Sequence, residues 1–190
     1  MTFVSSAQRP SKQTAISLYL QSVRENGIKP SSLAALAFAQ KDMLEQKKDS
    51  DLFLLRPEFR RLFKVVLTGG VFDVIHHGHL HTLCEAKKLG DVLVVVVATD
   101  KTVRDKKNLE PMHSQNERAE LVGELRVVDL AIVGVSNWQD TLSRVSPDVV
   151  VFGYDQSEMK LPRGIQVVKL TTHGANPNSK TGEVRKRLGL

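Results

Sequence analysis

Histidines gather in one short stretch of the chain. Four of the six, His76, His77, His79 and His81, lie within six residues. Gly78 suits the start of a helix, where unpaired backbone N–H groups and the helix dipole favour bound phosphate. Imidazoles at a helix start can donate hydrogen bonds to phosphate oxygens while charge develops on them. We therefore expect His76 and His79, which flank Gly78, to act in the transfer of a phosphorus-containing group.

Two other interpretations of the histidines stay open. A zinc site needs three or four convergent ligands, whereas the i, i+3 spacing supplies two, and no well-placed second cluster completes the set. His77 and His81 also fit ordinary surface or core positions. The lone Cys84 forms neither an internal disulfide nor a thiolate metal site, and we expect it to fill core space in a protein of a reducing cytoplasm.

Apolar, β-branched runs from Lys64 onward predict the elements that position these residues. Five runs are continuous rather than alternating, as in strands buried on both faces: 65–67, 92–98, 130–133, 149–152 and 167–170. Helical stretches are expected at 80–89, at 114–125 with a capping box from Ser114 to Glu117, at 138–145 and at 179–188. This alternation predicts an α/β fold, an open five-stranded parallel sheet of Rossmann-like type with helices on both faces. Ligands then sit beyond the carboxyl ends of the strands.

The chain before Lys64 reads as a separate helical extension. Ile16, Leu20 and Val23 recur at helical spacing, and Gly27 with Pro30 ends the pattern. A second amphipathic helix is expected from Ser31 or Ser32 through Leu44, followed by a linker or short helix over 56–64. We therefore predict two regions, residues 1–63 as a helical N-terminal extension and linker and residues 64–190 as the domain that carries the histidines.

The charge of the chain follows the same division. The 190 residues carry a formal net charge of +6. Residues 1–64 hold eleven Lys and Arg against six Asp and Glu, whereas the remaining residues hold sixteen against fifteen. The basic excess therefore belongs mainly to the extension. The longest apolar run, 92–98, is far shorter than the roughly 20 residues of a membrane-spanning helix, so we expect no membrane partner.

The segment from Thr68 to Asp73, followed by His76-x-Gly78-His79, resembles the signature of the nucleotidyltransferase superfamily. This superfamily includes glycerol-3-phosphate cytidylyltransferases, pantetheine-phosphate adenylyltransferases and archaeal FAD synthases. The resemblance extends from about Lys64 to the C-terminus through four further segments: 87–91, 98–103, 127–129 and 153–156. It implies that a phosphomonoester attacks the α-phosphorus of a nucleoside triphosphate and expels pyrophosphate.

The resemblance also implies roles for particular residues. The catalytic groups would be His76, His79 and Lys101 from a basic loop that follows the second strand. Mg²⁺ would arrive with the triphosphate, with Asp73 as a candidate metal partner. Arg118 would grip a phosphate or support that loop. The nucleotide-binding residues would be Thr68, Gly69, Gly70, Phe72, Gly78, Lys106, Arg118, Gly153, Tyr154, Asp155, Gln156, Ser179, Lys180 and Thr181.

Two segments bear on the substrate. The segment from Gly153 to Gln156 looks like the archaeal FAD synthase version, which favours ATP over CTP and FMN as the acceptor. The segment 178–186 departs from the family, since Gly182-Glu183 adds a residue and the cysteines often found there are absent. A CTP-dependent cytidylyltransferase acting on glycerol phosphate or a similar headgroup phosphate is the first alternative, and a pantetheine-phosphate adenylyltransferase is the second.

An alternative from another class is a nucleotide-sensing regulator whose N-terminal helices bind DNA. The complete histidine motif argues against it, because a sensor needs no transfer histidines, and nucleic acid is therefore not an expected partner. Relatives are commonly dimers, so a homodimer is among the associations that the resemblance leaves open.

Overall fold

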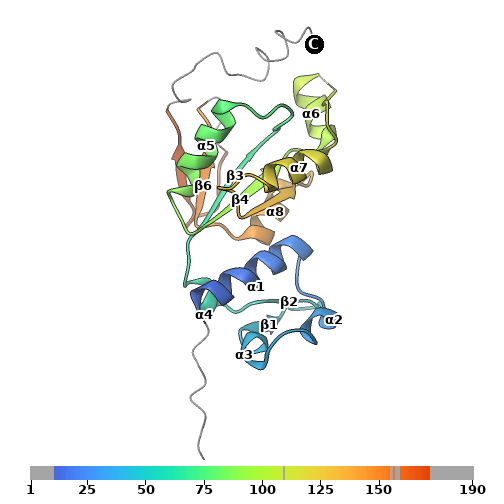
Figure 1. Ribbon diagram of the computed structural model, residues 1–190, viewed down its shortest axis with the longest axis vertical. Helices are drawn as coiled ribbons and strands as arrows, with labels where there is room; N and C mark the ends of the chain where they lie inside the picture. Colours follow the sequence, from blue (N-terminus) through green and yellow to red (C-terminus); the bar gives the residue numbers. More distant parts are fainter. Residues whose placement is uncertain (1–10, 109, 155, 157–158, 172–190) are drawn as a thin grey trace, which may run out of the picture. The chain divides into compact units, whose positions relative to one another are not determined.

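The structure is a computed structural model that describes residues 11–108, 110–154, 156 and 159–171, without the side chains of Lys106 and Lys107. The chain divides into two compact units, residues 1–63 and 64–190 (Figure 1). Each unit has its own sheet, two-stranded in the first and five-stranded in the second.

The first unit begins with the amphipathic helix that the apolar spacing predicts. Helix α1 spans Lys12–Glu25, and the Ser11 side chain caps it by accepting a hydrogen bond from the Thr14 amide at 3.1 Å. The helix ends at Asn26 in the left-handed conformation, with φ 57°. Its inner face buries Leu18, Tyr19 and Val23, among others.

The single second helix expected from residue 31 to Leu44 is wrong. Two four-residue helices stand there instead, α2 (Pro30–Leu33) and α3 (Phe38–Lys41), because Ala37 is extended with φ −64° and ψ 156°. Strand β1 (Leu44–Gln46) then pairs antiparallel with β2 (Phe53–Leu55), and α4 (Pro57–Arg60) follows. Ile28 bridges to Phe53, so pairing between distant residues overrides the local helical spacing.

The second unit is built on the five-stranded parallel sheet that the apolar runs predict. The strands are β3 (Val65–Gly70), β4 (Val92–Val97), β5 (Leu130–Val133), β6 (Val149–Phe152) and β7 (Gln166–Lys169), in the order β5-β4-β3-β6-β7. All four pairings are parallel. The predicted fold class is therefore confirmed, with strand ends within three residues of those expected.

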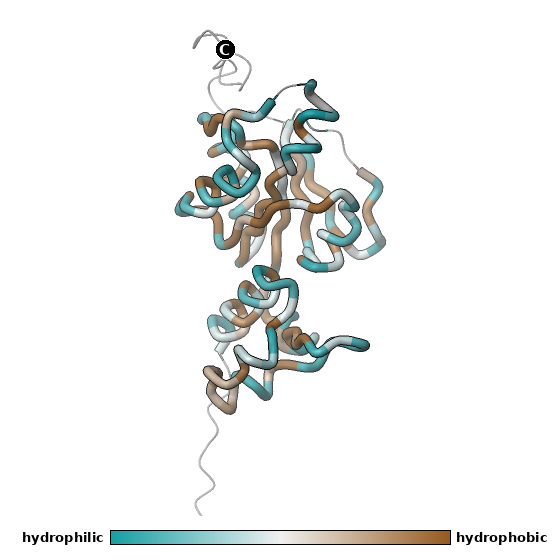
Figure 2. The backbone as a smooth tube through the Cα atoms, turned by 90° about the vertical axis from the view of Figure 1, so that its right-hand side faces the viewer, coloured by the Kyte–Doolittle hydropathy of each residue, from teal (hydrophilic) through white to brown (hydrophobic). Residues whose placement is uncertain are grey.

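Among the described residues, four helices lie between these strands: α5 (His77–Lys87), α6 (Asp100–Lys107), α7 (Gln115–Gly123) and α8 (Trp138–Val145). One core cluster joins residues of α5 and α7 to Leu93, Val95 and Val97 of β4, so these two helices cover the same face of the sheet (Figure 1). Right-handed crossovers place α8 on the opposite face. Figure 2 shows the strands as predominantly hydrophobic segments between helices of mixed polarity.

Two local details differ from expectation. Helix α5 begins at His77 rather than residue 80, because His76 is extended and forms its N-cap. The basic segment after β4, expected as a loop, is helix α6. Its start is fixed by Thr99, whose side chain accepts a hydrogen bond from the Thr102 amide at 3.1 Å, and Asn108 ends it with φ 50°.

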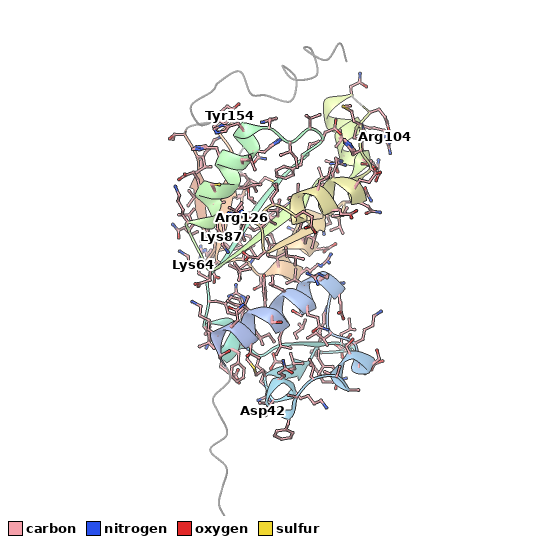
Figure 3. All side chains as sticks on the ribbon, viewed as in Figure 1. Asp42, Lys64, Lys87, Arg104, Arg126 and Tyr154 are labelled. Atoms are coloured by element: carbon pink, nitrogen blue, oxygen red, sulfur yellow. The ribbon has the colours of Figure 1, made fainter. Side chains whose placement is uncertain are left out.

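Aspartates fix the amino ends of the central strands. Asp91 accepts from the Lys64 amide at 2.8 Å, Asp148 from the Val65 amide at 2.7 Å, and Asp129 from the Leu93 amide at 2.6 Å. Lys64, Lys87 and Arg126 lie at this end of the unit, whereas Arg104 and Tyr154 lie at the opposite end, where the strands end (Figure 3).

Candidate functional site

Neighbouring strands bring the predicted site segments together. In the sheet order β4-β3-β6, the strands are adjacent and parallel, so the segments after Gly70, Val97 and Phe152 all leave the same edge. The chain connections diverge at the carboxyl end of β3. From there the chain passes through α5 to β4 on one side of β3, whereas β6 lies on its other side. Such a switch point is where open α/β sheets bind ligands.

The two histidines that flank Gly78 contact each other at the start of α5. Their rings are stacked, with centroids 3.8 Å apart and planes 20° apart. The His76 carbonyl accepts from the amides of His79 at 2.9 Å and Leu80 at 3.2 Å, so both imidazoles belong to the first turn. The Nδ1 atoms of both rings are shielded from solvent. The structure therefore brings together the pair that the sequence singles out.

Phe72 packs against this pair. Its side chain is buried, and its ring centroid lies 4.9 Å from that of His79. The backbone of Phe72 is left-handed, with φ 53°. A Cβ atom on Gly70 would lie 2.9 Å from the Phe72 ring, which explains why glycine stands there.

Thr68 and Gln156 connect β3 to the strand β6 and the segment after it, near the carboxyl ends of the two strands. The buried Thr68 hydroxyl donates to the Val151 carbonyl at 2.9 Å. The Gln156 amide donates to the Gly69 carbonyl at 2.7 Å and accepts from the Gly153 amide at 2.9 Å. These side chains hold the backbone at the switch point, and their contact with a nucleotide stays a prediction. Tyr154 lies beside them, half-buried.

Asp73 has a structural role in the described residues. Its carboxylate accepts from the amides of Met112 at 2.7 Å and His113 at 3.3 Å, and its carbonyl lies 3.2 Å from His113 Nδ1. No group of three or more His, Cys, Asp or Glu side chains that could hold a metal ion occurs in the described part of the chain. The metal role of Asp73 stays a prediction, beside an anchoring role that the structure shows directly.

Arg118 is fully buried, with no exposed side-chain surface. Its guanidinium donates to the carbonyls of Val71, Ala98 and His113 at 2.5, 2.9 and 3.0 Å, and to Asp100 Oδ1 at 2.6 Å. All three nitrogens of the guanidinium thus bind protein acceptors. Of the two roles that the sequence leaves open for Arg118, this geometry favours support of the surrounding loops over contact with a phosphate.

Lys101 lies on the exposed side of α6. Its side chain is 76% exposed and pairs with Asp105 at 3.0 Å. A surface pair of this kind is weak and exchanges readily for another anion. The side chain of Lys106, together with Asp155, Ser179, Lys180 and Thr181, lies outside the described residues, so the structure does not bear on these predictions.

Asp100 and His113 are two residues of the site that the sequence did not single out. Both contact groups that it did, since Asp100 pairs with Arg118 and His113 lies against Asp73. A buried arginine needs a partner for its charge. The presence of Arg118 on a predicted helix is therefore the feature of the sequence that could have pointed to Asp100. His113 carries no comparable signal, because its contact joins residues forty positions apart.

No helix among the described residues is long and apolar enough to cross a membrane.

Comparison with known proteins agrees with this geometry. The family described as "Cytidylyltransferase-like" matches residues 67–174. Two relatives named "FAD synthase", from Thermoplasma volcanium and Thermoplasma acidophilum, are 41% and 43% identical over 133 residues, which cover 65% of this chain and 92% of each relative. A third, from Thermococcus kodakarensis, is 48% identical over 93 residues, which cover 48% of this chain and 62% of that relative.

A solved structure has the same architecture. It is the "lipopolysaccharide core biosynthesis protein" from Thermoplasma volcanium, with a TM-score of 0.52 and 39% identity, and the match covers 57% of this chain and 96% of that one. The family match spans more than half of the chain and contains the histidine pair, β4, β6 and β3 from residue 67 onward. The chain therefore belongs to the cytidylyltransferase-like family and is a nucleotidyltransferase.

Proposed function

We propose that the protein transfers AMP from ATP to FMN, forming FAD and pyrophosphate. Two observations support this choice of substrates within the family. Relatives named FAD synthase share more than 40% of residues over nearly their whole length. The segment after β6, with Gly153, Tyr154 and Gln156, also resembles the corresponding segment of archaeal FAD synthases.

The reaction needs positioning and charge stabilisation rather than a covalent protein intermediate. A phosphate oxygen of FMN attacks the α-phosphorus of ATP and forms a new P–O bond. The bond from the α-phosphorus to the bridging oxygen of the β-phosphate breaks, and pyrophosphate leaves with the electron pair. His76 and His79 donate hydrogen bonds to the α-phosphate and the leaving oxygen, and the α5 N-terminus adds its dipole.

Other groups hold the two ends of ATP. The backbone at Gly69, Gly70 and Phe72 approaches the nucleotide closely, and Tyr154 with Asp155 contacts the base and ribose. Mg²⁺ bound to the triphosphate would neutralise part of its charge, with Asp73 as the candidate protein ligand. The triphosphate is held by basic and hydroxyl side chains: Lys101, Lys106, Ser179, Lys180 and Thr181.

The observation that carries the transfer chemistry of this proposal is the stacked pair of His76 and His79, at the start of the helix that follows the central strand. Pyrophosphate release, with ATP and CTP each combined with FMN, glycerol 3-phosphate and phosphopantetheine, tests it. We expect turnover with ATP and FMN only, and FAD as the product by chromatography. Turnover with CTP and glycerol 3-phosphate instead, or with no pair, would overturn the choice of substrates.

We also propose a cytoplasmic location, since a single cysteine suits a reducing compartment. Cys84 is exposed, and not buried in the core as the sequence led us to expect.

A further inference from the structure

The backbone of Phe72 has an unusual conformation just before the histidine pair. Its φ of 53° is left-handed, which is uncommon for a bulky residue that is not glycine. Such conformations persist where the surrounding structure fixes them, and they cluster at functional sites. The contacts that hold Phe72 therefore indicate how the site is kept in shape.

Both neighbours of Phe72 are fixed by the segment that contains α7. On one side, the Val71 carbonyl accepts from Arg118 Nη1 at 2.5 Å. On the other side, Asp73 accepts from the amides of Met112 and His113. Phe72 is thus held between the bound carbonyl of Val71 and the bound carboxylate of Asp73, and both contacts oppose relaxation of the left-handed turn.

Arg118 is the more central of the two anchors. Besides Val71, its guanidinium binds the carbonyls of Ala98 and His113 and the carboxylate of Asp100. One side chain on α7 therefore joins the segments that follow β3 and β4. A lysine cannot replace it, because a single ammonium group does not reproduce the planar fork that reaches several acceptors.

The contacts continue from Phe72 to the histidine pair. The Phe72 ring lies 4.9 Å from the His79 ring at an angle of 52°, and the His79 ring stacks on His76 at 3.8 Å. The Phe72 ring and the His79 ring are in van der Waals contact, so a change in the φ of Phe72 would displace its ring and alter the environment of His79.

We infer that Arg118 is a positioning residue, which acts through Phe72 to set the orientation of the His79 and His76 imidazoles. It does not bind the triphosphate, because its nitrogens already bind protein acceptors. The kinetic part of this inference rests on the proposed adenylyl transfer, whereas the effect on the imidazoles does not.

The test compares Arg118→Lys with Arg144→Lys, which changes a half-buried arginine on α8 outside these contacts. NMR titration of the imidazoles, in the absence of substrates, is the first readout. We expect the signals of His79 and His76 to shift in Arg118→Lys and to be unchanged in Arg144→Lys. Unchanged imidazole signals in a folded Arg118→Lys protein would overturn the inference, whether or not the enzyme makes FAD.

Kinetics supply the second readout. Arg118→Lys is expected to lower kcat at least tenfold and to raise the KM for ATP by a smaller factor, because both imidazoles are misplaced, whereas only the Phe72 part of the proposed nucleotide contacts is disturbed. A raised KM with unchanged kcat would identify Arg118 as a phosphate ligand and overturn the inference. The kcat of the double variant Arg118→Lys/Phe72→Leu should be only slightly lower than that of the slower single variant. If the loss in kcat of the double variant equals the product of the two single losses, the two residues act independently, which would contradict action through Phe72.

A milder variant covers the case in which Arg118→Lys does not fold. Asp100→Asn keeps a hydrogen-bond acceptor and removes only the charge of one partner, at a side chain that is 23% exposed. In Asp100→Asn we expect the His79 signal to shift less than in Arg118→Lys and in the same direction. We expect kcat to fall two- to fivefold. No shift in folded Asp100→Asn would overturn the inference.

Discussion

At the scale of single residues, the histidine pair depends on neighbours that do no chemistry. Gly70 leaves room for the Phe72 ring, and that ring contacts His79. Substitutions can distinguish the reacting histidines from the residues that hold them in place. A change to a reacting histidine should lower kcat without changing stability, whereas a change to a supporting residue should alter both.

His79→Ala should leave the fold intact and lower kcat by about 10²–10³-fold, the range found when one donor to a developing charge is removed. His77→Ala is the matched control, because His77 is an exposed neighbour on the same helix. Pyrophosphate release measures kcat, and circular dichroism confirms folding. A near-normal rate in folded His79→Ala would contradict the assigned role.

Gly70→Ala should disturb the site through sterics alone. The new Cβ would meet Phe72 Cε2 at 2.9 Å, so the ring must move away from its present place beside His79. Gly123→Ala on α7 is the control, because its Cβ would have an ordinary contact at 3.7 Å and alanine favours a helix by up to about 1 kcal/mol over glycine. The unfolding temperature and kcat should fall for Gly70→Ala only. Equal changes of both quantities in the two variants would argue against crowding at Phe72.

At the scale of elements, the aspartates before β4, β5 and β6 hold the amino ends of neighbouring strands. Asp129 illustrates this role, since it accepts from both the Leu93 amide and the Lys87 ammonium group. These contacts lie at the end of the sheet opposite the histidines, so they affect stability rather than chemistry.

Asp129→Ala is expected to lower the free energy of unfolding by about 1–3 kcal/mol, because it leaves the partly buried Leu93 amide without its acceptor. Asp105→Ala removes only an exposed pair with Lys101 and should lower it by less than about 1 kcal/mol. Urea denaturation measures both. Equal losses would show that the Leu93 contact does not stabilise the sheet.

The stability that the capping box of α7 contributes should depend on pH. Hydrogen bonds from the Ser114 side chain and then its backbone amide lower the pKa of Glu117 below its usual value. Because the folded pKa is lowered, this contribution to stability is present above the unfolded pKa and is lost as pH falls through the folded pKa. Ser114→Ala should raise the pKa of Glu117 in an NMR titration, and an unchanged value would exclude the Ser114 hydroxyl as the main cause of the lowered pKa.

The sequence predicted these elements unevenly, for physical reasons. Continuous apolar runs and the Ser114 capping box predicted the strands and α7, because both signals are local. The short helices and the hairpin near Leu44 could not be predicted in this way, since the bridge from Ile28 to Phe53 decides them. At the site, the spacing of the histidines predicted their association, whereas the burial of Arg118 and the left-handed Phe72 depend on contacts between segments far apart in sequence.

At the scale of the whole molecule, the second unit contains every described residue of the candidate site. We therefore expect a protein of residues 64–190 to fold and to keep the kcat of the full chain within about twofold. Circular dichroism and pyrophosphate release with ATP and FMN test this expectation. An unfolded or inactive truncated protein would show that residues 1–63 contribute to the catalytic domain.

The central position of β3 has a consequence for synthesis of the chain. One edge of β3 pairs with β4, but the other pairs with β6, through contacts such as Thr68 with Val151, which are 83 residues apart. During translation, β3 therefore emerges long before the partner of its second edge. An apolar strand edge stays open in that interval, so a ribosome that stalls between residues 98 and 149 would hold an intermediate prone to aggregation.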